Sequence, residues 1–169
     1  MRRLHLRMPT HIGRVAQVSV SPGGVPKGAV SQAWVATSGV EHDVQGDRRH
    51  HGGPDRAVCL YSADLLRRLA SEGHPIGPGT TGENLTIEGI AWEALRPGTV
   101  LEVGEVELEV TDFAAPCATI RGSFADANSN RINEQKWPGW SRLYARVLRE
   151  GVVKPGDEVR VQGGGTGRS

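Results

Sequence analysis

Glycine and proline interrupt this chain so often that it is best explained as many short strands joined by turns. Together they account for about one residue in five of the 169, which is high for a helical protein but below the roughly 25–30% typical of disordered chains. Aromatic residues contribute only 5%, so Val, Leu, Ile and Ala must build the core. A chain of this length is expected to form one domain.

The clearest local pattern is a hairpin over residues 100–110. Val and Leu alternate strictly with Glu in 100–103 and 106–110, and Gly104 and Glu105 between them suit a two-residue type II′ turn. Such alternation predicts strands with one apolar face and one acidic face.

Other segments carry weaker strand signals, and one carries a helix signal. Ser62 is expected to cap a short helix that runs to Ser71, with Leu65, Leu66 and Leu69 on its packing face. The segment 143–149 fits a helix or a strand by pattern alone, and Gly151 soon after it favours a strand. Residues 121–138 are polar and predict an irregular loop. Further strands are predicted at 12–20, 32–37, 57–61, 84–87, 152–153 and 159–161.

The predicted fold class is therefore mostly β, a barrel or sandwich with one or two short helices. Residues 1–162 form the predicted single domain. Residues 163–169 have nothing to pack and predict a flexible tail.

The charge and hydropathy of the chain limit the classes of partner that it can bind. The 20 basic and 19 acidic side chains give a net charge of +1, which argues against a general nucleic-acid binder. No apolar run approaches the ~18 residues of a membrane span, and no signal-peptide stretch follows Met1. We therefore expect a cytoplasmic protein with a small-molecule substrate and no membrane partner. Cys59 and Cys117 lie in different sequence surroundings, and no disulfide is expected.

The densest cluster of candidate site residues lies at 47–56. Arg48, His51 and Arg56 flank the glycine pair Gly52 and Gly53, which offers charged donors beside an approachable backbone and suits an anion such as a phosphate. A solvated turn explains the composition equally well. The histidines lack the spacing of a helical zinc site.

Cys117 is the candidate reactive thiol. It follows the hairpin and Pro116, so it lies at or just beyond a strand end, where a rigid support presents reactive side chains. The alternative is a buried inert thiol, which is the reading for Cys59 in its apolar run. A Cys-His pair would require His51 to come from a distant segment. Asn84 precedes an apolar strand and fits either a capped turn or a binding role.

Taken in order, four segments resemble the MOSC family, named for the C-terminal domain of molybdenum-cofactor sulfurases. The resemblance runs from about residue 13 to residue 161. It is carried by GDRRHHGGPDRAV at 46–58, GENLT at 82–86, PC at 116–117, and LYARVL at 143–148 followed by Gly151 and PGD at 155–157.

This resemblance implies a β-barrel-like domain in which Cys117 binds molybdenum or carries sulfur. A soft thiolate suits molybdenum beside the two dithiolene sulfurs of molybdopterin. The arginines would bind the pterin phosphate, and Asn84 would contact a ring or oxo group. The residues implied around the cofactor are Arg48, His51, Gly52, Gly53, Arg56, Asn84 and Arg142.

Three functions follow as hypotheses. The first is a molybdenum-cofactor protein that removes oxygen or hydroxyl from a small substrate. The second is a metal-free sulfur-transfer or carbon–sulfur-bond enzyme with Cys117 as nucleophile or persulfide carrier. The third is a non-enzymatic molybdopterin carrier. No pyridoxal-dependent desulfurase domain is recognised, so pyridoxal phosphate is not expected, and a separate redox or sulfur-donor protein is. We expect residues 51–53, residues 82–84 and Cys117 to line one cleft at a rim of the barrel.

Overall fold

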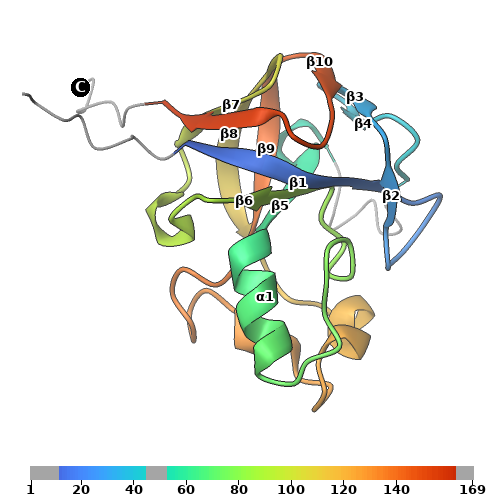
Figure 1. The fold of residues 1–169 in the computed structure, drawn as a ribbon, viewed down its shortest axis with the longest axis vertical. Coiled ribbons are helices and arrows are strands. Elements are labelled where there is room, and N and C mark those ends of the chain that lie inside the picture. Colours follow the sequence, from blue (N-terminus) through green and yellow to red (C-terminus); the bar gives the residue numbers. More distant parts are fainter. Residues whose placement is uncertain (1–11, 45–52, 163–169) are drawn as a thin grey trace, which may run out of the picture.

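A closed β-barrel forms the centre of the molecule (Figure 1). The computed structural model describes residues 12–44 and 53–162. In these residues seven strands follow the order β11-β7-β8-β9-β5-β6-β1, and β1 pairs back to β11. The barrel strands are β1 (Ile12–Val20), β5 (Val58–Ser62), β6 (Leu85–Glu88), β7 (Val100–Val103), β8 (Val106–Ala114), β9 (Arg142–Arg149) and β11 (Glu158–Val161). The mostly-β barrel expected from the sequence is confirmed.

Smaller strands extend the barrel on one side. β2 (Gly28–Val30) pairs with the end of β1. A separate three-stranded sheet joins β3 (Ala33–Ala36) to β4 (Gly39–Val40) and β10 (Gly151–Val153). The sequence predicts β3 and β10 closely, but it misses the two- and three-residue strands β2 and β4, which are too short to show a period.

One α-helix connects two barrel strands. β5 and β6 are parallel neighbours, and α1 (Ala63–Ser71) provides the crossover that a parallel pair requires. The Ser62 hydroxyl accepts a hydrogen bond from the Leu65 amide at 3.1 Å, as the predicted N-cap should. Leu65, Leu66 and Leu69 are all buried. In the described residues, no helix has the length and apolar character needed to cross a membrane.

The predicted hairpin is confirmed residue by residue. Val100 pairs with Glu109 and Val103 pairs with Val106. Gly104 has φ +56°, the left-handed value that the first position of such a tight turn requires.

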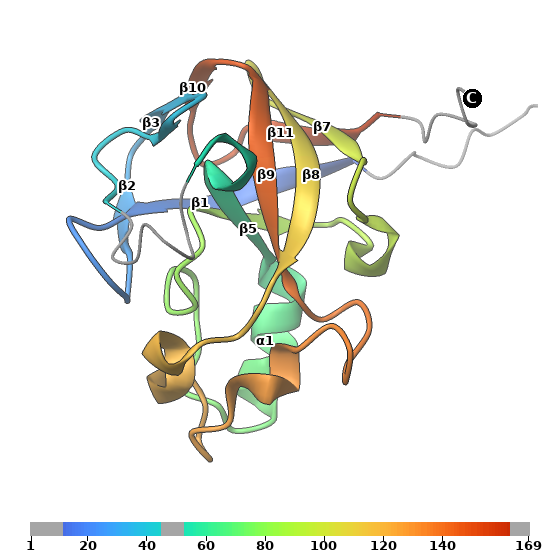
Figure 2. The same cartoon turned by 180° about the vertical axis from the view of Figure 1, so that it is seen from behind.

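Alternation along the strands gives the barrel wall two distinct faces. Leu60 and Leu143 are register partners and point into the main core. Their neighbours Cys59 and Tyr144 are also register partners, and side chains of successive strand residues point to opposite faces. These two side chains, with Ala114, form a separate cluster on the outer face of β5, β8 and β9, which lie side by side in Figure 2.

The polar segment after Cys117 is more ordered than its sequence predicts. It holds two 3₁₀ helices, η3 (Ala118–Ser123) and η4 (Ser129–Ile132). The short helices η1 (Pro54–Arg56) and η2 (Trp92–Ala94) lie elsewhere. Single turns of 3₁₀ helix have no hydrophobic period, so sequence patterning does not reveal them.

Arg131 fastens this segment to α1. Its guanidinium bonds both carboxylate oxygens of Glu72 at 3.0 and 2.9 Å. It also lies 3.9 Å from the ring centroids of both Trp137 and Trp140. The bond from Arg131 is the main reason that the pKa of Glu72 is lowered.

Removing this clamp is expected to weaken the fold. Arg131→Ala should lower the free energy of unfolding by about 1–3 kcal/mol, because cation–π contacts and a bidentate pair are lost together. Arg67→Ala is the matched control, since Arg67 forms exposed pairs with Asp64 and Glu88, and it should change stability by less than about 0.5 kcal/mol. Urea unfolding measures both. An equal loss of stability in the two variants would contradict the stabilising role of Arg131.

Candidate functional site

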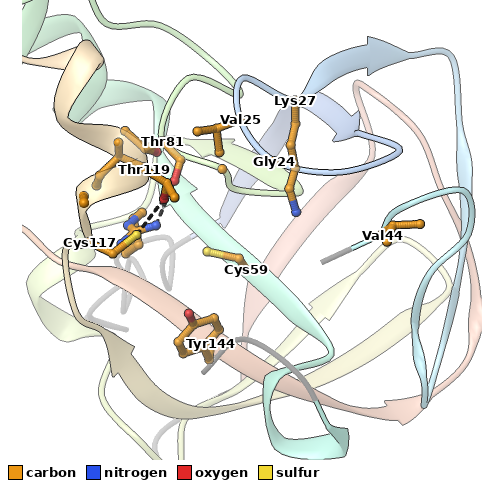
Figure 3. Close-up of a pocket in the computed structure, with 13 residues that line it drawn as sticks. Gly24, Val25, Lys27, Val44, Cys59, Thr81, Cys117, Thr119 and Tyr144 are labelled. Carbon is orange, nitrogen blue, oxygen red and sulfur yellow. Dashed lines mark hydrogen bonds between the residues drawn. The ribbon is translucent and has the colours of Figure 1, made fainter. Parts of the chain in front are cut away.

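A cavity of about 410 Å³ lies on the outer face of the barrel wall (Figure 3). Cys59 and Tyr144 come from neighbouring strands of that wall, and Arg142 is the first residue of β9. Residues outside the barrel strands complete the lining, namely Gly24, Val25, Lys27, Val44, Thr81, Gly82 and residues 117–120. These residues therefore turn an outer sheet face, which would otherwise meet solvent, into a sheltered site.

Cys117 presents a partly exposed thiol to this cavity. It follows Pro116 and precedes η3, just beyond the end of β8, as the sequence predicts. Its Sγ atom lies 2.7 Å from Thr119 Oγ1, and Figure 3 shows this bond at the cavity wall. The hydroxyl fixes the direction of the sulfur and can donate to it when it is a thiolate.

Cys59 lines the same cavity, although its sequence surroundings differ from those of Cys117. It is buried, as predicted, with 7% of its surface exposed. Burial raises the pKa of its thiol, which favours the neutral form. The apolar sequence around Cys59 predicts a buried strand, and alternation along β5 turns the Cys59 side chain to the face opposite Leu60.

Arg142 places a buried positive charge beside the two thiols. Only 4% of the residue is exposed. Its guanidinium donates to the carbonyl oxygens of Thr81 at 2.8 Å and Ala115 at 3.0 Å. Within residues 12–44 and 53–162, its buried Nε has no hydrogen-bond partner and no carboxylate forms a salt bridge with it. Such a cation is suited to an anionic ligand.

Tyr144 adds an aromatic surface and a hydroxyl. Burial is the largest cause of its raised pKa, so the phenol stays protonated. The guanidinium of Arg56 lies 5.1 Å from the centroid of its ring. Arg56 therefore contacts Tyr144, which lines the cavity, but Arg56 is not itself a lining residue.

Asn84 lies behind the cavity and not in its lining. Its Oδ1 accepts a hydrogen bond from the Cys59 amide at 3.1 Å. Its Nδ2 donates to the Ser19 carbonyl at 3.2 Å and to Asp43 Oδ2 at 3.0 Å. Because Nδ2 donates to two protein groups, Asn84 is placed to position its neighbours; its contact with a ring or oxo group, which the family resemblance implies, stays a prediction.

Lys27 is a lining residue that sequence reasoning missed. Its ammonium lies 2.8 Å from Asp43 Oδ2, and their side chains are 9% and 3% exposed. Asn84 therefore holds Asp43, and Asp43 holds Lys27. No local motif marks Lys27, because only the folded chain brings residues 27, 43 and 84 together.

The other predicted site residues divide in two groups. Arg48, His51 and Gly52 lie outside the described residues. Gly53 is exposed and does not line the cavity. Of the expected cleft, Gly82 and Cys117 line this one cavity, whereas Glu83 and Asn84 are not among its lining residues.

Residues 47–160 match the family model of the MOSC domain. The chain belongs to the MOSC family. The uncharacterized protein YflK of Bacillus subtilis is 30% identical over 145 residues, which cover 84% of this chain and 64% of YflK. Protein YiiM of Escherichia coli is 28% identical over 141 residues, which cover 80% and 59%. This MOSC protein thus spans less than two thirds of the length of either relative.

Solved structures of other proteins share the fold. YiiM from Geobacillus stearothermophilus superposes with a TM-score of 0.68 at 23% identity, covering 92% of this chain and 77% of that one. The YUAD protein from Bacillus subtilis gives a TM-score of 0.68 at 15% identity, with 89% and 95% covered. The barrel is therefore common to proteins whose sequences have diverged widely.

The buried pair behind the cavity is expected to be important for stability. Asp43→Asn leaves the Lys27 ammonium buried without its counter-charge and should lower the free energy of unfolding by about 3 kcal/mol. Lys27→Met combined with Asp43→Asn should recover at least half of that loss. Glu41→Gln is the control, since Glu41 pairs with His42 at the surface. Thermal unfolding of the three variants tests this, and wild-type stability in Asp43→Asn would contradict it.

Proposed function

We propose that this MOSC protein binds a molybdopterin-type molybdenum cofactor through Cys117 and removes oxygen or hydroxyl from a small substrate. One observation carries the proposal. A single cavity joins a partly exposed thiol to a buried guanidinium that has no carboxylate partner in the described residues. A cofactor that combines a thiophilic metal with an anionic phosphate complements both features.

The donor set fits this group. A cysteine thiolate is a soft ligand of the kind that such a metal accepts. Arg142 offers its orphaned Nε donor, and Lys27 adds a second cation at the wall. The cavity also lies within the usual range of roughly 300–1,000 Å³ for small-molecule sites.

Each residue has a role in this proposal. When bound, the molybdenum centre would supply two electrons and polarise the departing oxygen. Cys117 would hold the metal, Arg142 would orient the anionic end, and the protonated Tyr144 would donate a hydrogen bond. Arg48, His51, Gly52, Gly53 and Arg56 remain predicted contacts of the cofactor. Electrons would come from a separate redox protein in the cytoplasm.

Sulfur transfer is the second candidate. Here Cys117 would accept sulfur from a donor protein and carry it as a persulfide, with no metal bound. The observation that favours it is the second thiol, Cys59, in the same cavity. A persulfide adds the mass of one sulfur atom to Cys117, which separates this candidate from the first.

Two cysteine variants test the proposal. Protein purified from a molybdenum-replete host should contain molybdenum, and Cys117→Ser should lower the content at least tenfold, since loss of a metal ligand costs more than about 1.4 kcal/mol of binding. Cys59→Ser is the matched control and should retain the metal, because its buried thiol stays neutral. Elemental analysis with mass spectrometry measures both. Equal loss in two folded variants would refute the assignment, and extra sulfur on Cys117 without metal would favour sulfur transfer.

A further inference from the structure

Glu83 is a fully buried carboxyl group directly behind the cavity wall. None of its surface is exposed, and in the described part of the chain no basic side chain forms a salt bridge with it. The Thr81 hydroxyl donates to its Oε1 at 2.8 Å, the Thr86 hydroxyl donates to its Oε2 at 3.0 Å, and the backbone of Gly79 and of Glu83 also bonds the carboxyl group. Removal from water raises the pKa of Glu83 more than these hydrogen bonds lower it.

Thr81 connects this buried acid to the cavity. It lines the cavity, whereas Thr86 does not, and Figure 3 shows it on the same side as Thr119 and Cys117. Its carbonyl oxygen accepts the bond from Arg142, which fixes it beside the buried cation. A hydroxyl accepts one hydrogen bond and donates another. In the structure the fully buried Thr81 donates to Glu83. When Glu83 holds a proton, rotation of the Thr81 hydroxyl lets it accept that proton and donate its own toward the cavity that it lines.

We propose that Glu83 is a proton reservoir that serves the cavity through the hydroxyl of Thr81. In the step, the O–H bond of Glu83 breaks and its proton joins Thr81 Oγ1. The proton that Thr81 held passes to an oxygen or nitrogen acceptor in the cavity. Glu83 is left as a carboxylate, and no electrons move. This inference rests on the proposed function only for its acceptor, the oxygen that leaves a hydroxylated substrate.

The surroundings favour both states of Glu83. Glu83 interacts electrostatically with Cys59 and Tyr61 on β5, and Arg142 on β9 donates to the carbonyl oxygen of Thr81, the residue that bonds Glu83. Burial raises the pKa of both Cys59 and Tyr61, so these two stay neutral. A newly formed carboxylate keeps the hydrogen bonds from the Thr81 and Thr86 hydroxyls and from the backbone of Gly79 and Glu83. When the proton leaves, the buried Glu83 carboxylate therefore still has hydrogen-bond donors around it.

Infrared spectroscopy in D₂O tests the reservoir without turnover. The carboxylic C=O band of wild-type protein at neutral pH should shift with ¹³C-labelled glutamate, which assigns it to a glutamate side chain, and should be absent from Glu83→Gln, which assigns it to Glu83. The change of this band after transfer to D₂O times the exchange of the Glu83 proton. Thr81→Val should slow this exchange at least about tenfold, because the proton then leaves only when the structure opens, and Thr81→Ser should restore it.

Thr86→Val is the matched control. It removes the other hydroxyl partner of Glu83, away from the cavity, and should leave exchange within about threefold of wild type. A wild-type spectrum without a glutamate carboxylic band would overturn the proposal, because Glu83 would then be ionised. Wild-type exchange in Thr81→Val, or equal slowing in Thr86→Val, would overturn the relay. Because the readout needs no metal, a failure of the molybdenum proposal appears in metal content and leaves this result standing.

Discussion

Closure of the barrel by β1 is the constraint on which the rest of the structure depends. The start of β1 pairs with β11, its middle with β6, and its end with β2. In a closed barrel each strand residue faces either the core or the outside. The same period that packs Leu60 and Leu143 inside therefore turns Cys59, Tyr144 and Arg142 outward. The candidate site is the consequence of covering that outward face with loops.

Close contact between two of these loops shapes the cavity. Gly79 accepts the Lys27 amide hydrogen bond at 2.9 Å, and a Cβ at Gly79 would lie 2.2 Å from the Lys27 carbonyl oxygen. Gly82 has φ +81°, and its Cβ would lie 2.8 Å from Val25. Glycine at both positions lets the loops meet. The side chains of Asp43, Glu83 and Arg142 are buried in this wall, where each interaction is stronger than in water.

Local patterning predicted the parts of this molecule that depend on neighbours in sequence. Alternation gave the hairpin at 100–110, the Ser62 cap gave α1, and the strand end gave Cys117 its partly exposed position. The pairing of distant segments decided the rest. No local sequence pattern shows that Cys59 and Lys27 line the same cavity as Cys117. None shows that Asn84 supports the cavity wall. Arg142 was predicted as a site residue from the family resemblance alone. The fold shows that it is a buried cation in the same cavity as the two thiols.

The central claim is that Cys117 is the protein's own sulfur ligand to a metal held in this cavity. X-ray absorption at the molybdenum edge, on protein purified with its cofactor, measures the sulfur atoms around the metal directly. The account predicts three sulfur neighbours in the wild type, two from the dithiolene and one from Cys117, and one fewer in the metal that Cys117→Ser still retains. An unchanged sulfur shell in Cys117→Ser would contradict it.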